Sequence, residues 1–391
     1  MKLPNASDSL KLLRELISFP SVSLTPNIDL MRHVQDVLDQ AGIQSELVSD
    51  PHDATRCNLF ASVGPEGVPG ILLSGHTDVV PVSGQPWTMP PFEATERDGR
   101  IYGRGSADMK GFVACAVMAM VRAAKLPLKC PLQLALSFDE EIGCVGVRHL
   151  LQALEGKLPA PMLCLVGEPT LMQIGTGHKG KAAYRAVCHG QAGHSGLAPR
   201  FVNAIHTAAD LIAAMRDIQR DLASGGPMEE GFSIPYSTVH AGLIKGGVAL
   251  NIVPDRCELN FEVRTVSQDD PDEIVARVLR RTAQRMGQGG QSVEHAAPSV
   301  EKVNGYPGLN SDDDSRAIAV LASMLPAGTL CTKVDYGSEG GLFKKSWNTT
   351  SVLICGPGSI SVAHKADEYV EISQIVACDQ LLSALADSLC R

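Results

Sequence analysis

The feature that most restricts the fold of this chain is a series of short apolar runs, separated by helix-length segments, that each end in polar residues. Such runs lie at Ile71 to Leu73, Leu132 to Phe138 and Met162 to Val166, and a long apolar helical segment covers Phe112 to Ala124. Apolar runs that alternate with helices are typical of strands buried on both faces of a sheet. The sequence therefore predicts an α/β fold with a mixed, mostly parallel sheet flanked by helices.

The pattern changes after His178, which indicates a second domain inserted into the first. Strands are predicted at Lys181 to His189, Ser237 to Lys245 and Cys257 to Val266, helices at Asn203 to Arg220 and Asp272 to Met286, and a final strand at Ser292 to Ala296. This order is that of a ferredoxin-like α+β sandwich. Beyond Pro298 the first pattern returns, with a helix at Ser315 to Met324, a strand at Ser351 to Cys355 and a closing helix at Glu371 to Leu389. We expect a catalytic domain formed by residues 1–177 and 298–391, interrupted by a domain at 178–297.

Charge and cysteine content limit the classes of partner and the compartment. The formal net charge of -9 disfavours nucleic acid and anionic membrane surfaces, because both need a basic face. The 11 cysteines are odd in number and form no CxxC pair, which is typical of reduced thiols. The N-terminus runs into a helical pattern without an apolar leader, and no later run is long enough to span a bilayer. We expect a cytoplasmic protein that binds a small molecule, with no nucleic acid and no membrane as partner.

A histidine and an aspartate follow the first apolar run at a spacing that places them on one face. His76 and Asp78 lie two residues apart, and alternate residues of an extended segment point the same way. His76 can bind a metal ion while Asp78 accepts a hydrogen bond from its other ring nitrogen, which fixes the tautomer. The alternative is a turn that Asp78 caps.

Acidic residues also lie in the bend before the predicted helix near Phe112 and directly after a predicted apolar strand. Asp108 lies in a glycine-rich bend before the helix that starts near Phe112, where it either binds a ligand or only caps the helix. Glu140 and Glu141 directly follow an apolar strand, where adjacent like charges repel unless cations compensate. One of the two carboxylates can bind a metal while its neighbour serves as a general base. A solvated acidic loop is the alternative.

Two more side chains complete a possible metal site. Glu168 follows the run that ends at Val166, and His364 lies in a loop after the strand that ends at Cys355. A lone histidine is more often structural. His364 is therefore a candidate ligand only because it occurs together with the other candidate metal ligands. The full set of candidate ligands is His76, Asp108, Glu141, Glu168 and His364.

Two nitrogens and three carboxylates suit two zinc ions or related divalent ions. If Asp108 bridges, each ion receives one histidine and one further carboxylate. Four positive charges are then balanced by three carboxylates and a bridging hydroxide. Two metals about 3.5–4 Å apart lower the pKa of a bridging water toward 7, and Glu140 would take its proton and return it to a leaving amine.

Five motifs together resemble the zinc-dependent aminoacylase and carboxypeptidase family. They are Ser-Gly-His76-Thr-Asp78-Val-Val-Pro, Gly-Arg-Gly-Ser-Ala-Asp108-Met-Lys-Gly, Asp-Glu140-Glu141, Gly-Glu168-Pro-Thr and Ala-His364-Lys-Ala-Asp-Glu-Tyr, in family order. The resemblance implies that His76 and Glu168 hold one zinc, that Glu141 and His364 hold the other, and that Asp108 bridges them. It also implies that Asp78 supports His76, that Glu140 is the general base, and that cobalt can substitute for zinc.

The resemblance also implies a homodimer formed through the inserted domain and a set of substrate contacts. His194, in Ala-Gly-His194-Ser-Gly, corresponds to a histidine that reaches the partner's active site and stabilises an oxyanion. Asn251 and Arg264 occupy positions where relatives bind the substrate carboxylate, although ordinary strand polarity is the alternative. Glu339, in Asp-Tyr-Gly-Ser-Glu339, suits a cationic amine on the substrate.

The implied activity is removal of an N-acyl group from an amino acid. The favoured reaction converts N2-acetylornithine to ornithine and acetate in arginine biosynthesis. Ser338 replaces the threonine usual in the branch and Gly340-Gly341 follow it, which leaves the acyl amino acid open. Succinyl-diaminopimelate, another acyl amino acid or a dipeptide is the alternative substrate, and a noncatalytic dimeric binding protein is the alternative of another class.

Overall fold

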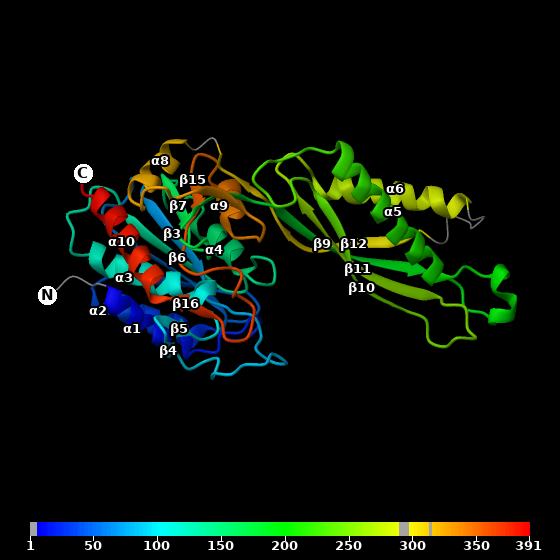
Figure 1. The fold of residues 1–391 in the computed structure, drawn as a ribbon, viewed down its shortest axis with the longest axis horizontal. Helices are drawn as coiled ribbons and strands as arrows, with labels where there is room; N and C mark the ends of the chain where they lie inside the picture. Colours follow the sequence, from blue (N-terminus) through cyan, green and yellow to red (C-terminus); the bar gives the residue numbers. More distant parts are fainter. Residues whose placement is uncertain (1–5, 289–296, 313–314) are drawn as a thin grey trace. The chain divides into compact units, whose positions relative to one another are not determined.

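The computed structural model describes residues 6–288, 297–312 and 315–391, and the chain divides into two compact units (Figure 1). The first unit comprises Met1–His178 and Leu309–Arg391, and the second comprises Lys179–Gly308. The chain thus leaves the first unit after His178 and returns to it at Leu309. We expected the chain to return at residue 298, so the observed return lies further along the chain.

The first unit is built on a large mixed sheet. Its strands are β1 (Ser45–Ser49), β2 (Cys57–Val63), β3 (Ile71–His76), β6 (Leu132–Ser137), β7 (Leu163–Val166), β8 (Ile174–His178), β13 (Leu309–Asn310), β14 (Cys331–Val334) and β15 (Ser351–Ile354). They follow the order β1-β2-β6-β3-β7-β15-β8-β13, and β14 also pairs with β8. The central strands β6, β3, β7 and β15 are parallel, whereas β1, β2 and β13 pair antiparallel with their neighbours. The predicted mixed α/β sheet is confirmed.

Helices cover both faces of this sheet (Figure 1). They are α1 (Ala6–Ile17), α2 (Ile28–Gln40), α3 (Gly111–Ala123), α4 (Gly146–Leu154), α8 (Ser315–Ser323), α9 (Gly340–Ser346) and α10 (Ile372–Ser388). Leu73 of β3 joins the core formed with α1, α2, α3 and α10. Leu72 points to the opposite face and is also fully buried, on the side where α4 contacts β6 and α9 contacts β15.

A small antiparallel sheet brings two distant segments together. It consists of β4 (Thr95–Arg97), β5 (Arg100–Tyr102) and β16 (Tyr369–Glu371), in the order β16-β5-β4. Tyr102 lies opposite Tyr369, and Gly103 N–H donates to Glu368 O at 2.9 Å. The loop that follows β5 therefore runs beside the loop that precedes β16.

The second unit is a ferredoxin-like sandwich. Its elements are β9 (Gly180–His189), a short helical turn (Ser195–Arg200), α5 (Ala204–Gly225), β10 (Thr238–Gly246), β11 (Arg256–Thr265), α6 (Pro271–Gln288) and β12 (Ser299–Tyr306). The strands follow the antiparallel order β10-β11-β9-β12. Leu259, Phe261 and Val263 alternate toward the core shared with α5 and α6. The predicted fold of the insertion is confirmed.

The fourth strand of this sandwich differs from our expectation. The strand predicted at Ser292 to Ala296 lies outside the described residues, and β12 occupies the fourth position by pairing with β9. Our boundary at 298 was therefore too early. Most of β12 is exposed or half-buried, so its side chains carry little periodic signal, and its pairing with β9 alone assigns it to this unit.

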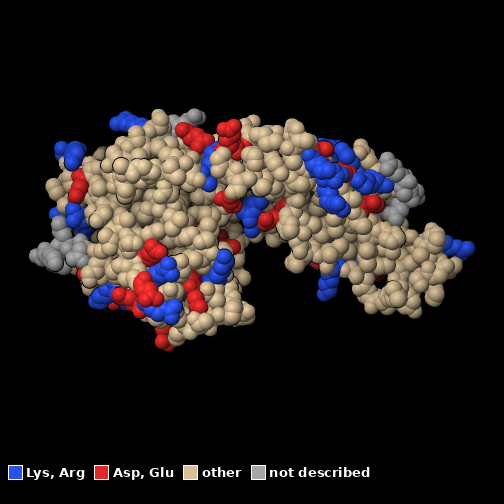
Figure 2. All heavy atoms as spheres, in the orientation of Figure 1, with Lys and Arg blue, Asp and Glu red and all other residues tan. Residues whose placement is uncertain are grey.

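Opposite charges pair across the helices of the second unit. Figure 2 shows basic and acidic side chains close together over α5 and α6. Arg285 of α6 pairs with Asp217 of α5, and Arg281 lies 3.7 Å from Asp217 and 3.6 Å from Asp221. These pairs bind the two helices to each other at the surface. Across the described segments, no helix has both the length and the apolar character needed to cross a bilayer.

Candidate metal centre

Four parallel strands end at one edge of the large sheet, and the predicted site residues gather there. His76 at the end of β3 lies opposite Ser137 at the end of β6, and Ser74 lies opposite Val166 at the end of β7. Ile354 at the end of β15 pairs with Val166 as well. Because parallel strands expose their carboxyl ends at one edge, side chains that follow these strands can meet.

His76, Asp108 and Glu168 form the first cluster, in which each residue offers a ligand atom within 4.8 Å of the others. His76 Nε2 lies 3.1 Å from Asp108 Oδ1. All three side chains are buried, although they come from the end of β3, from the turn before α3 and from the segment after β7. Burial of two carboxylates beside one imidazole is costly without further positive charge.

Asp108 also belongs to a second cluster, together with Glu141 and His364. His364 Nε2 lies 3.0 Å from Glu141 Oε1 and 3.2 Å from Asp108 Oδ2. The two oxygens of Asp108 thus face different histidines, Oδ1 toward His76 and Oδ2 toward His364. The structure brings together all five predicted ligands, and Asp108 is common to both clusters.

Burial and neighbouring negative charges raise the pKa values of two carboxylates of the site, those of Glu140 and Glu168. Burial raises the pKa of Glu140 to about 8, with the negative charges of Glu141 and Glu339 adding to the effect. Burial and then the charge of Asp108 raise the pKa of Glu168 well above its usual value. Burial and neighbouring negative charges both disfavour the ionised form of a carboxylate, whereas a nearby cation favours it.

The donor set fits divalent metal ions. Two imidazole nitrogens and three carboxylates are the ligand types that zinc and related ions prefer. Two such ions would supply four positive charges to a pocket that holds Asp108, Glu141 and Glu168, besides Glu140. The residues present therefore fit one ion in each cluster.

Asp78 connects the two sides of the site. His76 Nδ1 lies 2.9 Å from the backbone oxygen of Asp78 and 3.5 Å from Asp78 Oδ1, so the backbone oxygen is its nearer acceptor. The carboxylate of Asp78 instead accepts the backbone N–H of Glu140 at 3.0 Å and that of Glu141 at 3.3 Å. Ser23 Oγ also donates to it at 2.7 Å. Asp78 thus orients His76 and holds the acidic turn, which contains Glu140 and Glu141.

Glu140 lies beside the clusters and belongs to neither of them. Its side chain is buried, and the Cys144 thiol donates to Glu140 Oε1 at 3.3 Å. Glu141, the next residue, turns its carboxylate toward His364 instead. The two adjacent glutamates therefore diverge, and their roles as ligand and base stay a prediction.

Glu339 is buried beneath the carboxylate cluster and is only 1% exposed. Ser74 Oγ donates to Glu339 Oε2 at 3.2 Å, and burial raises the pKa of this carboxyl to about 7. A direct contact with a substrate amine would need the carboxylate to become accessible. Its predicted role as a substrate contact stays a prediction.

The other predicted substrate contacts lie in the second unit. His194 and Asn251 are exposed neighbours there, since Ser195 N–H donates to Asn251 O at 3.1 Å and His194 pairs with Ile252. Arg264 of β11 donates to Glu262 Oε1 and to the Tyr306 hydroxyl, both at 3.1 Å. His194 and Asn251 thus share one surface, whereas Arg264 already has two partners.

Four charged residues that the sequence analysis did not assign hold the loops of the site. Arg56 pairs with Asp139, which precedes Glu140 and has a φ of 53°. Arg104 pairs with Glu368 at 2.7 Å, and both side chains are fully buried. Asp139, Glu368 and Arg104 lie within the quoted motifs, which was the only available signal. Their partners are 83 and 264 positions away, so no spacing rule could find them.

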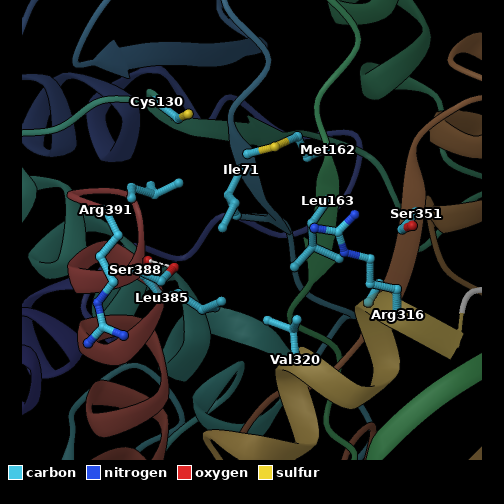
Figure 3. A pocket seen from close by; sticks show the side chains of 12 residues that line it. Ile71, Cys130, Met162, Leu163, Arg316, Val320, Ser351, Leu385, Ser388 and Arg391 are labelled. Atoms are coloured by element: carbon cyan, nitrogen blue, oxygen red, sulfur yellow. Dashed lines mark hydrogen bonds between the residues drawn. The ribbon is translucent and has the colours of Figure 1, made fainter.

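A cavity of about 560 Å³ opens at the opposite end of the same strands (Figure 3). Ile71, Leu163 and Ser351, the first residues of β3, β7 and β15, contribute to its lining. Arg316 and Arg391 lie at its sides. None of the predicted site residues lines it, so the cavity is separate from the clusters at the carboxyl ends.

The sequence of this chain is similar to those of known proteins. The family described as Peptidase family M20/M25/M40 matches residues 72–388. An acetylornithine deacetylase from Klebsiella pneumoniae (strain 342) is 32% identical over 395 residues, which cover 99% of this chain and 99% of that protein.

Solved structures share the fold. The M20 family metallo-carboxypeptidase Sso-CP2 from Sulfolobus solfataricus has a TM-score of 0.78 at 19% identity, covering 98% of this chain and 99% of that chain. The YXEP protein of Bacillus subtilis, described as a dinuclear metal binding peptidase from M20 family, has a TM-score of 0.70 at 16% identity, covering 97% of each chain.

Proposed function

Because the chain belongs to Peptidase family M20/M25/M40 and is thus a metal-dependent amide hydrolase, we propose that it removes the acyl group of an N-acyl amino acid at a two-metal site. The observation that carries this proposal is the sharing of Asp108 between two clusters, one with His76 and Glu168 and one with Glu141 and His364. We propose N2-acetylornithine as the substrate, with ornithine and acetate as products in arginine biosynthesis. The 32% identity to an acetylornithine deacetylase supports this choice.

The five ligands divide between two ions in this proposal. His76 and Glu168 would hold one zinc, Glu141 and His364 would hold the other, and Asp108 would be shared between them. Cobalt can take the place of zinc, because it accepts the same nitrogen and oxygen donors. When bound, such ions polarise the scissile carbonyl and lower the pKa of a water at the site.

Glu140 moves the proton. Its carboxylate accepts a proton from the attacking water and delivers it to the nitrogen of the breaking C–N bond, so that the amine leaves neutral. The divergence of Glu140 from Glu141 leaves it free of the ligand set. The hydrogen bond that Glu140 N–H donates to Asp78 Oδ1 holds the base in place.

The second unit supplies substrate contacts and the dimer interface in this proposal. His194 stabilises the oxyanion, from its own chain or from a second copy, and Asn251 and Arg264 bind the substrate carboxylate. The edge strand β10 supports dimerisation, because Leu243 is 68% and Ile244 55% exposed there. An edge strand with exposed apolar side chains can pair with a second copy.

The proposal also covers the charge of the substrate side chain and the compartment of the enzyme. The negative charge of Glu339 favours a substrate with a cationic side chain, acting from beneath the cluster. The enzyme acts in the cytoplasm, and its free cysteines support a reducing compartment.

The test is hydrolysis by the purified, zinc-loaded protein of a panel containing acetylornithine, succinyl-diaminopimelate, other N-acyl amino acids and dipeptides. We expect acetylornithine to have the highest kcat/KM. A higher value for succinyl-diaminopimelate or a dipeptide would replace the substrate and keep the chemistry. No hydrolysis of any member with zinc or cobalt would favour a noncatalytic binding protein.

The role of Glu140 is tested by Glu140→Gln. We expect this variant to keep its metal and to lose about 100- to 10,000-fold in kcat, because general base catalysis contributes on that order. Glu155→Gln, on the exposed residue that follows α4, is the matched control and should keep the wild-type kcat. Wild-type turnover in Glu140→Gln would overturn the proposed mechanism.

A further inference from the structure

One buried carboxylate joins the loop that carries Asp108 to the loop that carries His364. Antiparallel pairing of β5 with β16 brings the two loops together, since Tyr102 lies opposite Tyr369. Glu368 stands directly before Tyr369 and is 0% exposed. Its side chain points into the turn that leads from β5 to Asp108.

Four donors surround the carboxylate of Glu368. Its Oε1 accepts the backbone N–H of Ala107 at 3.0 Å and that of Asp108 at 3.1 Å. Its Oε2 accepts the backbone N–H of Gly105 at 3.1 Å and Arg104 Nη1 at 2.7 Å. Successive backbone N–H groups that converge on one anion form a rigid nest.

We propose that Glu368 is a positioning residue for both metal clusters, because it fixes the backbone of Asp108 relative to the loop of His364. The inference rests on the proposed two-metal function. Asp108 must direct Oδ1 toward His76 and Oδ2 toward His364 at the same time, which requires a defined backbone position. Glu368 holds the N–H of that same residue.

The need for such a clamp follows from the exposure of His364. This side chain is 48% exposed, whereas that of Asp108 is 6% exposed, so few packing contacts restrain the histidine. Arg104 strengthens the link, because Arg104 Nη1 also donates to Lys365 O at 3.1 Å, in the residue after His364. Partners behind metal ligands affect metal affinity by about 10- to 100-fold when they are removed.

The neighbouring acid provides a matched control. Asp367 lies on the same loop, but it accepts Thr88 N–H at 2.9 Å and Thr88 Oγ1 at 2.8 Å. Among the described residues, the donors to its carboxylate are Thr88 and Met89, which lie outside the segment from Gly105 to Asp108. Loss of Asp367 should therefore loosen a different loop and leave the position of Asp108 unchanged.

The experiment compares Glu368→Gln and Asp367→Asn with the wild-type protein. Bound zinc is counted by mass spectrometry after dialysis, dissociation constants are measured by competition with a chelator, and the visible spectrum of the cobalt form reports ligand geometry. We expect Glu368→Gln to raise the dissociation constant of at least one ion by about 10- to 100-fold and to alter the cobalt spectrum. Asp367→Asn should match the wild type in both.

Glu368→Gln leaves Arg104 buried without an anionic partner, which can prevent folding. The double variant Arg104→Met/Glu368→Gln removes that charge and repeats the test in a protein without it. A folded variant of either kind that holds two ions with wild-type affinity and an unchanged cobalt spectrum overturns the inference. If the wild-type protein itself binds no ion, the proposed function fails as well. Two tight ions in the wild type without hydrolysis of acetylornithine would contradict only the proposed substrate.

Discussion

Replacement of Asp78 by asparagine is the substitution that best tests whether the acidic side chains of the site are held in defined positions. The Asp78 carboxylate accepts Glu140 N–H on Oδ1, and Glu141 N–H and Ser23 Oγ on Oδ2. An asparagine keeps the shape of the side chain but offers only one acceptor oxygen. Its amide NH₂ must then face one of the two backbone donors.

The size of the effect follows from these contacts. With the oxygen kept on Glu140 N–H, the new NH₂ faces Glu141 N–H, which lay 3.3 Å from the oxygen it replaces. A buried donor without a partner costs about 1–3 kcal/mol. If the turn moves to avoid that cost, the base and one ligand move with it. Since about 1.4 kcal/mol corresponds to a factor of ten, we expect kcat to fall about 5- to 150-fold.

The assay is steady-state hydrolysis of acetylornithine by the zinc-loaded protein, with kcat and KM measured separately. Ser23→Ala is the control, because it removes one donor to the Asp78 carboxylate without placing a donor against the acidic turn. A neutral hydrogen bond contributes about 0.5–1.5 kcal/mol, so this control should lose less than about tenfold. Wild-type kcat in Asp78→Asn, or an equal loss in Ser23→Ala, would refute the positioning of the turn by Asp78.

Three further outcomes are expected. Removal of the metal by a chelator should lower the free energy of unfolding of the first unit by about 2.7 kcal/mol, compared with the protein in free zinc at 100 times the dissociation constant. Calorimetry should show that added zinc restores this stability. Gly167→Ala should destabilise the protein by about 1–3 kcal/mol or more in chemical denaturation, because its Cβ would lie 1.9 Å from the Phe112 ring, whereas Gly225→Ala meets nothing within 4 Å and should not. If the protein forms the proposed dimer, Leu243→Asp combined with Ile244→Asp should convert it to a folded monomer in light scattering, and a persistent dimer would place the interface elsewhere.

Much of the fold could be predicted because its signals are local. The continuous apolar runs at β3, β6 and β7 indicated strands buried on both faces, and α3 was visible as an apolar helical segment whose one charged residue, Arg122, lies in its last turn. The strand β12 was missed as part of the second unit because its half-exposed side chains carry no clear period. Its membership depends on pairing with β9, more than a hundred positions earlier in the chain.

The ligands could be predicted for a related reason. Parallel strands end at one edge, so acids and histidines that follow several strands must lie near one another. The supports of those ligands could not be predicted. Asp78 was expected to act on His76, but its carboxylate also holds the Glu140 turn, which only the folded backbone reveals. Glu339 was placed among substrate contacts, and the structure buries it under the cluster.

The sequence by itself determined the types of element, the nested order of the two domains and the five side chains gathered at the strand ends. These depend on periodicity and on chemistry that adjacent residues carry. The resemblance implied a bridging Asp108, but only the tertiary structure decided that Glu368 and Arg104 hold its turn, because those contacts join residues more than 250 positions apart. Closure of the chain over such distances is set by the packing of the whole unit, so no short stretch of residues contains it.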